Sequence, residues 1–339
     1  MSTLAYAYGQ PASRGILKQY PEDFIVNEIL GFDLTGEGEH LFLFIEKRTI
    51  NTEDVAREIA RELKLSPRAV SYAGLKDRQA LTRQWFSIHL PGKNNLNIEL
   101  PQGEQWKILN TQRHNKKLKT GALDGNQFQL ILRDIHIEDK IEERLAAIAA
   151  NGVPNYFGEQ RFGNNGQNLY KAEQLLFADM KVKNPFLKGM YYSAARAYLF
   201  NRILDYRIGK GNWNQAVAGD VMQLAGTHSV FHCDSPDEII QQRIKAFDIS
   251  PAGALWGGGN NRVTDSALAL QQEALADLLS WCEALEAHKL EIAYRAFILQ
   301  VKDMRWEWLS EKELFLEFAL TSGSYATSVI RELLLTLKE

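Results

Sequence analysis

The sequence predicts an α+β fold in which a sheet-forming domain is interrupted by a largely helical insertion. Strand-like patterns occur towards both ends of the chain, apolar residues recur at helical spacing through most of its middle, and 339 residues suffice for two domains. Apolar residues make up 45% and charged residues 24% of the chain, as is ordinary for a globular protein. We therefore expect a domain with a mixed or antiparallel sheet at residues 1–152 and 291–339, and an α+β insertion at residues 153–290.

The first part of the chain alternates between strands and helices. Runs rich in β-branched and aromatic residues, or with alternating polarity, predict strands at 24–29, 41–47, 85–90, 106–109 and 128–132. Asn51 and Thr52 offer N-caps for a helix over 53–65, and Ser66-Pro67 opens a further short helical turn. A helix over 138–152 follows, with Gly152 as its C-cap.

A compositional break at residues 153–158 precedes the mostly helical middle of the chain. Apolar spacing and start signals predict helices at about 169–180, 193–208, 236–247 and 264–288. The glycine-rich segment 256–261 lacks the Lys-Ser/Thr of a phosphate loop and is interpreted as a turn. The last part of the chain predicts strands at 294–301 and 314–320 and a helix at about 325–337.

Composition excludes several classes of function. The two cysteines, Cys233 and Cys282, cannot build a disulfide framework, and neither lies in a pattern with metal-ligand spacing. Motifs for dinucleotide binding, phosphate loops and serine hydrolases are absent from the sequence. The amino terminus lacks the pattern of a secretory signal, and no apolar run could span a bilayer. We expect a cytoplasmic protein with no metal and no membrane association.

The charge balance bears on nucleic-acid binding. A net charge of −3 argues against a protein that coats nucleic acid through overall basicity. An RNA-binding protein with this balance would need its cations gathered on one face, and segment 113–119 carries four of them, including Lys116, Lys117 and Lys119. An exposed basic loop without a ligand is the alternative.

Asp77 stands out because it lies between Lys76 and Arg78 in a polar segment just after Gly74. Neighbouring cations favour the ionised carboxylate, which could act as a nucleophile or a base. The same pattern is typical of a solvated turn in which all three charges face water. The local chemistry leaves both interpretations open.

Seven blocks of the sequence, in order and with similar gaps, resemble the TruD family of pseudouridine synthases, enzymes that isomerise uridine in transfer RNA. The blocks are Pro21–Phe24, Gly36–His40, Tyr72–Thr82, Gly121–Phe128, Val153–Gly163, Ser193–Arg196 and Gly323–Val329. The resemblance covers nearly the whole chain. It implies a pseudouridine-synthase-type catalytic domain with the family's own insertion domain.

The resemblance implies that Asp77 is the catalytic nucleophile and that the target is uridine 13, in the D arm of tRNA. The reaction needs no cofactor and no net redox change. The carboxylate could attack the base or the sugar, or take a proton from the sugar, and the sequence does not separate these routes. The resemblance also implies that Lys18 is the basic partner of Asp77. Because adjacent residues on an extended chain point to opposite sides, Lys76 and Arg78 are weaker candidates for that role.

Four further residues would form the substrate pocket by resemblance. Phe24, Phe128 and Tyr325 would supply its aromatic walls, and Asn126 a hydrogen bond to an extruded nucleotide. Many relatives carry Phe where this chain has Tyr325. By pattern alone, Phe24 and Phe128 are core residues of alternating strands.

Cations outside this pocket are candidate RNA contacts. Besides the three lysines of the basic segment, they are Lys76, Arg78, Arg161 and Arg196. We expect tRNA as the partner of a monomer that needs no other protein. The rival hypotheses are a non-catalytic RNA-binding or RNA-folding protein on the same scaffold and a metal-independent hydrolase that uses the same Asp.

Overall fold

The computed structural model describes residues 4–92 and 99–337, and the chain divides into two compact units. The sheet unit comprises Ala12–Asp139, Val301–Gly323 and Leu334–Glu339. The helical unit comprises Met1–Pro11, Lys140–Gln300 and Ser324–Leu333. The predicted domain limits at 152 and 290 stay a proposal, since the two units divide the chain at other positions.

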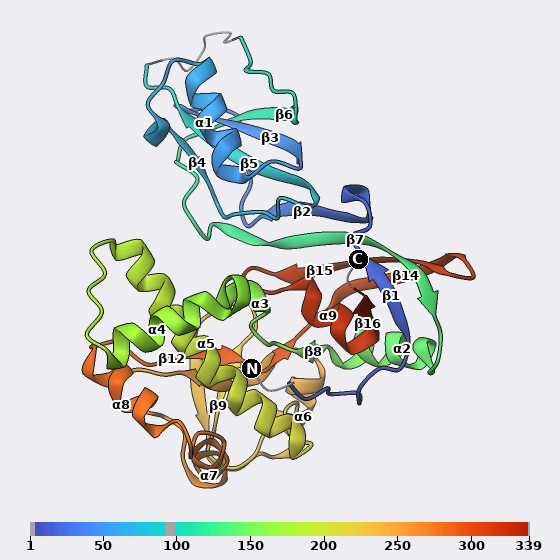
Figure 1. The fold of residues 1–339 in the computed structure, drawn as a ribbon, viewed down its shortest axis with the longest axis vertical. Helices are drawn as coiled ribbons and strands as arrows, with labels where there is room; N and C mark the ends of the chain where they lie inside the picture. Colours follow the sequence, from blue (N-terminus) through green and yellow to red (C-terminus); the bar gives the residue numbers. More distant parts are fainter. Residues whose placement is uncertain (1–3, 93–98, 338–339) are drawn as a thin grey trace. The chain divides into compact units, whose positions relative to one another are not determined.

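A ten-stranded sheet forms the sheet unit. Its strands are β1 (Arg14–Leu17), β2 (Phe24–Leu30), β3 (His40–Arg48), β4 (Val70–Tyr72), β5 (Leu81–His89), β6 (Trp106–His114), β7 (Leu123–His136), β14 (Lys302–Ser310), β15 (Glu313–Thr321) and β16 (Leu335–Leu337). Seven of them follow in the order β14-β15-β7-β2-β5-β3-β6, while β4 pairs with β5, and β1 pairs with both β7 and β16 (Figure 1). Since β2 is parallel to β5 and β1 to β16, among otherwise antiparallel pairs, the sheet is mixed and the predicted fold class is confirmed.

One helix packs on the β3–β5 part of this sheet. Helix α1 (Thr52–Glu62) is followed by the 3₁₀ turn η2 (Pro67–Ala69), and a second 3₁₀ turn, η1 (Pro21–Asp23), precedes β2. Val55 and Ile59 of α1 are fully buried in one cluster with Leu43 and Ile45 of β3 and Phe86 of β5. Each such side chain contributes about 1.5–3 kcal/mol by leaving water. The cluster therefore holds the β3–α1 connection firmly against the sheet.

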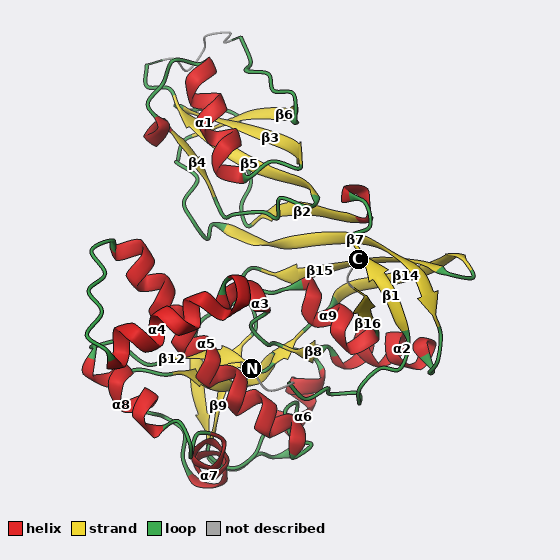
Figure 2. Cartoon of the chain, viewed as in Figure 1, coloured by secondary structure: helices red, strands yellow, loops and turns green. Residues whose placement is uncertain are grey.

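The helical unit combines helices with small sheets (Figure 2). Its helices are α2 (Ile141–Asn151), α3 (Glu159–Phe162), the 3₁₀ turn η3 (Asn164–Gly166), α4 (Gln167–Phe177), α5 (Pro185–Gly209), α6 (Glu238–Lys245), α7 (Asp265–Ala274), α8 (Leu279–Ala287) and α9 (Ala326–Leu333). Its strands are β8 (Val153–Pro154), β9 (Asp220–Leu224), β10 (Val230–Cys233), β11 (Ile249–Leu255), β12 (Ala293–Ala296) and β13 (Ile298–Leu299). The sheet orders are β10-β9-β11-β12 and β13-β8, and the long helix α5 supplies much of the buried core.

Several predicted elements of the helical unit are corrected by the structure. The strands β9, β10 and β11 were not predicted in the middle of the chain. The single helix expected at 264–288 is two helices, because the chain leaves the helix at Leu275 and resumes it at Leu279. Leu275 and Leu278 are both buried, so the apolar spacing continues through the break and hides it. The strand expected at 294–301 is divided into β12 and β13.

Elements near the sheet strands β6 and β16 also differ from the predictions. The strand expected at 106–109 continues to His114, so the basic segment begins inside β6. The helix expected to reach 337 ends at Leu333, because residues 335–337 form β16 beside β1. Strands β1 and β14 were not predicted at all. Pairing between distant segments decided these elements, and local patterns do not report such pairing.

Candidate active site

Asp77 lies in the segment that joins β4 to β5, and neighbouring elements hold this segment by its backbone. Thr52 Oγ1, at the start of α1, accepts a hydrogen bond of 3.0 Å from the Lys76 backbone N–H. Gln84 Nε2 on β5 donates to the Gly74 carbonyl at 3.2 Å. We call residues 73–80 the Asp77 loop. Its backbone groups have partners on two secondary-structure elements, which restrains the position of Asp77.

Both carboxylate oxygens of Asp77 accept hydrogen bonds. Lys18 Nζ donates to Oδ2, and the backbone N–H of Gln79 donates to Oδ1 at 2.9 Å. Lys18 follows β1 with a left-handed backbone angle, φ +65°, and its ammonium lies 4.1 Å from the centroid of the Phe24 ring. The side chain of Asp77 keeps 23% of its surface exposed, so a ligand can still reach the carboxylate.

A second ammonium lies against the Asp77 loop, from Lys47 at the end of β3. Lys47 is fully buried, and its Nζ donates to the carbonyl of Asp77 at 3.0 Å and to that of Ile50 at 2.9 Å. Burial lowers the pKa of Lys47 to about 8, although the charge of Asp77 opposes this shift. Lys47 was not among the predicted site residues. The signal for it was present, because it occupies an apolar position in the alternation Leu41, Leu43, Ile45.

The electrostatics of Asp77 favour the carboxylate over the acid. Burial by itself raises the pKa of Asp77, but the hydrogen bond and charge of Lys18, the Gln79 N–H and the charge of Lys47 outweigh it and hold the pKa below its ordinary value. Asp77 is therefore ionised at neutral pH. An ionised, partly exposed and doubly hydrogen-bonded carboxylate is suited to act as a nucleophile or a base.

The sequence neighbours of Asp77 point elsewhere. Lys76 Nζ binds Glu28 Oε2 at 2.6 Å, and the side chains of the two residues are 7% and 0% exposed. This burial corrects the prediction that Lys76 contacts RNA, since its charge is already neutralised inside the sheet unit. Arg78 is exposed and donates to the Thr49 carbonyl at 3.2 Å. Arg78 stays a candidate RNA contact.

Three of the predicted pocket residues share one face of the sheet. Val26 is opposite Phe128 across the β2–β7 pair, so Phe24, two residues before Val26, and Asn126, two residues before Phe128, lie on the same side of the sheet as Phe128. The Phe24 and Phe128 rings are 6.0 Å apart edge to face, and Phe128 stacks on Phe318 of β15 at 5.6 Å. Phe24 and Phe128 are both 6% exposed or less, as expected if they are core residues of the sheet.

This face of the sheet contains two buried polar atoms that bind nothing in the described part of the chain, Asn126 Oδ1 and Thr82 Oγ1. Thr82 on β5 is aligned with both Val26 and Lys47, which places it in the row that leads from Lys47 to Phe128. Buried polar atoms in folded proteins nearly always have partners, so an open one calls for an explanation. Thr82 is not among the predicted site residues, and no local pattern in the sequence marks it.

The other predicted residues lie in the helical unit. Tyr325 precedes α9 and lies beside Gly158, where a Cβ would meet the tyrosine ring at 3.6 Å. Arg161 in α3 donates to Ser193 Oγ at 3.0 Å. Arg196 in α5 donates to the carbonyls of Leu255 and Glu291, both at 2.8 Å. Because these two bonds tie Arg196 to its own unit, it is a weaker phosphate binder than predicted.

The basic segment is open to solvent. Lys116, Lys117 and Lys119 are exposed, whereas Leu118 between them is buried and anchors the segment in the core. No ion pair within the described residues involves any of these lysines. They stay candidate RNA contacts.

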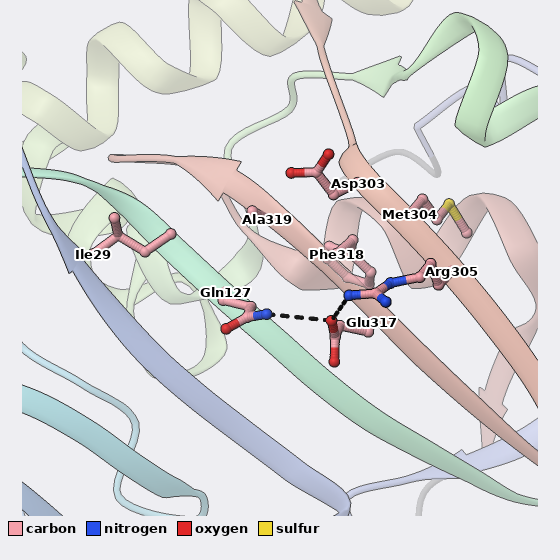
Figure 3. Close-up of a pocket in the computed structure, with 8 residues that line it drawn as sticks. All are labelled: Ile29, Gln127, Asp303, Met304, Arg305, Glu317, Phe318 and Ala319. Atoms are coloured by element: carbon pink, nitrogen blue, oxygen red, sulfur yellow. Dashed lines mark hydrogen bonds and ion pairs between the residues drawn. The ribbon is translucent and has the colours of Figure 1, made fainter.

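The opposite face of the sheet contains a hollow of about 570 Å³. Figure 3 shows Glu317 on its wall joined to Gln127 and Arg305. None of the predicted site residues lines it, since Gln127 and Asn126 are adjacent on β7 and point to opposite faces. Three of its polar side chains, those of Gln127, Glu317 and Arg305, bind one another, which favours a structural role.

The described residues contain neither a candidate metal cluster nor a helix able to cross a membrane. Residues 4–92 and 99–337 contain no group of three or more His, Cys, Asp and Glu side chains placed to hold a metal ion. Among the helices described, none has both the length and the apolar character that crossing a membrane requires. The expectation of a cofactor-free protein stays a prediction.

Comparison with known proteins identifies the family. The family model for tRNA pseudouridine synthase D (TruD) matches residues 1–181 and 167–333. The tRNA pseudouridine synthase D of Legionella pneumophila is 47% identical over 96% of this chain and 97% of the relative. That of Methylococcus capsulatus is 46% identical over 97% and 94%. A crystal structure from Methanosarcina mazei, described provisionally as tRNA pseudouridine synthase D, has the same fold, with a TM-score of 0.70 at 24% identity over 97% of this chain and 95% of that one. The resemblance seen in the sequence is confirmed, and the chain belongs to the TruD family of tRNA pseudouridine synthases.

Proposed function

We propose that this protein converts uridine 13, in the D arm of tRNA, to pseudouridine, with Asp77 as the nucleophile and no cofactor. Membership of the family supports the reaction class. The observation that carries the assignment of Asp77 is its ion pair with Lys18, which keeps a partly exposed carboxylate ionised. We further propose that the enzyme acts as a monomer on tRNA and needs no other protein.

The reaction breaks the bond between ribose C1′ and N1 of uracil, turns the base, and joins C1′ to C5. The proton on C5 leaves, and N1 gains a proton, so atoms and charge balance without a redox partner. Asp77 could act by attacking C1′, by attacking the base, or by taking a proton from the sugar. Each route needs the ionised carboxylate within about 3 Å of its target. The hydrogen bonds from Lys18 and Gln79 support such positioning.

A uridine in folded tRNA must leave its stack to reach Asp77. Phe24 and Phe128 would form an apolar floor beside the Lys18 ammonium. Tyr325 is a further proposed aromatic contact of the RNA. The open acceptor on Asn126 suits the N3–H donor of uracil. Thr82 lies on the same face, and its buried hydroxyl has no partner in the part of the chain that the structure describes, so it is a second group able to bind the base or ribose.

The direct test is to incubate an unmodified tRNA transcript with the purified protein and map pseudouridine by nucleotide position. We expect product at uridine 13 alone. Product at another position would refute the proposed site but keep the reaction. Binding without product would favour the non-catalytic RNA-binding protein, and release of free uracil would identify a hydrolase.

A further inference from the structure

A buried ion pair joins the Asp77 loop to strand β2. Lys76 Nζ lies 2.6 Å from Glu28 Oε2, and both side chains are almost completely buried. Lys76 immediately precedes Asp77, whereas Glu28 belongs to β2. Two opposite charges gain little net stability when both leave water, and apolar residues of similar size often stabilise a protein as well or better. The pair therefore calls for an explanation other than stability.

Both carboxylate oxygens of Glu28 accept hydrogen bonds. The parallel pairing of β2 with β5 ends at Asn27 and Arg83. Beyond it, the backbone N–H of Trp85 on β5 donates to Glu28 Oε1 at 3.1 Å, while Lys76 Nζ donates to Oε2. Because one oxygen is fixed to β5, the carboxylate holds the ammonium of the Asp77 loop in a defined place.

Glu28 is also the cross-strand neighbour of Asn126. The two residues are directly opposite in the antiparallel β2–β7 pair, so their side chains lie on the same face of the sheet. Asn126 Oδ1 is buried and has no partner among residues 4–92 and 99–337. The ion pair thus connects the residue before the proposed nucleophile with the residue beside the proposed base-binding amide.

Three other bonds of the Asp77 loop reach different elements. Thr52 at the start of α1, Gln84 on β5 and Lys47 on β3 bind backbone groups of the loop. The Lys76–Glu28 pair adds a link to β2, the strand next to β7. It is therefore placed to fix the loop relative to the strands that carry the proposed pocket.

We propose that Lys76 and Glu28 are positioning residues that set the distance between the Asp77 carboxylate and the Asn126 amide. We call the two residues the loop anchor. The inference rests on the proposed function, because it takes Asp77 to act on the nucleotide that Asn126 binds. The carboxylate must come within about 3 Å of its target. A small displacement of the loop would therefore slow the reaction without weakening RNA binding.

The first test separates positioning from stability by removing one charge and then both. Glu28→Gln keeps the size of the side chain and an acceptor for the Trp85 N–H, Lys76→Met removes the ammonium, and the double variant removes both charges. Each single variant leaves the other charge buried alone, so the double variant should unfold at a temperature closer to wild type than either single variant. We nevertheless expect all three to form pseudouridine about 10–100-fold more slowly than wild type in a single turnover at saturating tRNA. Their tRNA dissociation constants should stay within about threefold of wild type.

A folded double variant that regains the wild-type rate would assign the pair to the fold alone and overturn the proposal. If the double variant does not fold, a folded single variant decides, and a rate within about twofold of wild type would overturn the proposal. If none of the three folds, the pair is required for folding and the proposal is likewise overturned.

Glu46→Gln is the matched control for the loss of a paired carboxylate. Glu46 on β3 binds Arg83 at 2.7 Å and Lys107 at 2.9 Å, and its side chain is 14% exposed. Glu46 is adjacent to Lys47 in the strand, so the two side chains point to opposite faces of the sheet. Glu46→Gln should keep the wild-type rate.

Hydrogen exchange gives a second readout that does not depend on the reaction. The backbone N–H of Lys76 binds Thr52 Oγ1, and that of Gln79 binds Asp77 Oδ1. In the double variant we expect both N–H groups to exchange at least about tenfold faster than in wild type, with no such change in Glu46→Gln. Unchanged exchange at both groups would overturn the loop anchor.

The outcomes separate this inference from the proposed function. Pseudouridine made by wild type at uridine 13, together with unchanged rate and exchange in the double variant, would keep the enzyme assignment and remove the loop anchor. Faster exchange in the double variant, with no pseudouridine from wild type, would refute the proposed function and keep the restraint that Lys76 and Glu28 place on the loop.

Discussion

At Asp77 burial and ion pairing act in opposite directions. Burial favours the neutral acid, whereas the ammonium of Lys18, the N–H of Gln79 and the charge of Lys47 favour the carboxylate. The interactions with Lys18, Gln79 and Lys47 outweigh burial, so the pKa of Asp77 is lowered. Lys18 contributes through both a hydrogen bond and its charge, which makes it the residue whose loss should change the protonation of Asp77 most.

Replacing Lys18 by Met should therefore raise the pKa of Asp77. Without the ammonium, burial is opposed only by Gln79 and Lys47, and the acid limb of the single-turnover rate should move to higher pH. The pH profile of pseudouridine formation measures this shift. Arg14→Met is the control, since Arg14 on β1 forms an exposed ion pair with Glu138. An acid limb that stays in place in Lys18→Met would show that Lys18 does not tune Asp77.

Lys47→Met tests whether the second ammonium positions the Asp77 loop. Methionine fills a similar volume but cannot donate to the carbonyls of Asp77 and Ile50, so the carboxylate should lose its alignment. We expect the single-turnover rate to fall about 10–100-fold, with the tRNA dissociation constant within about threefold of wild type. The free energy of unfolding should be unchanged or higher, because a buried ammonium is costly.

Lys107→Met is the matched control for this variant, since Lys107 on the neighbouring strand β6 has a side chain that is 67% exposed. A Lys47→Met protein with the wild-type rate would assign Lys47 to packing alone.

Strand β7 connects the two halves of the sheet, since it pairs with β2 on one side and β15 on the other. At Gly125, strands β7 and β15 approach so closely that a Cβ on residue 125 would lie 2.2 Å from the Leu320 carbonyl oxygen. Gly125→Ala should force β7 and β15 apart beside Asn126. We expect it to lower the free energy of unfolding by about 3 kcal/mol, as measured by urea denaturation.

Gly189→Ala is the companion variant, because nothing lies within 4 Å of a Cβ there and Gly189 is in the exposed part of α5. It should raise the free energy of unfolding by about 0.5–1 kcal/mol. If Gly125→Ala and Gly189→Ala changed the free energy of unfolding equally, the result would contradict the close approach of β7 and β15.

Elements with strong local patterns were predicted from the sequence, and those made by distant pairing were not. Strands β2, β3 and β15 and helices α1, α2 and α4 lie within a few residues of their predicted positions. Strands β1 and β16 were missed or taken as helix because each is stabilised by the other, from opposite ends of the chain. The break between α7 and α8 was hidden because buried leucines continue the helical spacing across it.

The site was predictable in part. Asp77, Lys18 and Asn126 came from the family resemblance, and their spacing in the chain gives no local sign that they share a sheet unit. Lys76 was expected at the surface, but its partner Glu28 lies on β2, and only the parallel pairing of β2 with β5 brings the two segments together. Thr82 could not be predicted, because what distinguishes it is a buried hydroxyl with no hydrogen-bond partner among residues 4–92 and 99–337.

The net charge of −3 requires that tRNA binding depend on local groups of cations. If Lys116, Lys117 and Lys119 contact phosphates, replacing all three with Gln should reduce the salt slope of tRNA binding by roughly 2–3. The rate of the chemical step on bound RNA should stay within about twofold of wild type, since these side chains do not contact Asp77. A triple replacement of Lys64, Lys107 and Lys312, all exposed in the same unit, provides the comparison. An unaltered slope would return the basic segment to a solvated loop.

The most direct measurement of the role of Asp77 is the single-turnover rate of pseudouridine formation by Asp77→Asn at saturating tRNA, with binding measured separately. Asparagine keeps the shape and can still interact with Lys18 and Gln79, but it has no negative charge and is a poor nucleophile. We predict a loss of at least about 1,000-fold in rate, with tRNA affinity within about threefold of wild type. Product formation by Asp77→Asn at a rate comparable to wild type would contradict the assignment of Asp77 as the nucleophile.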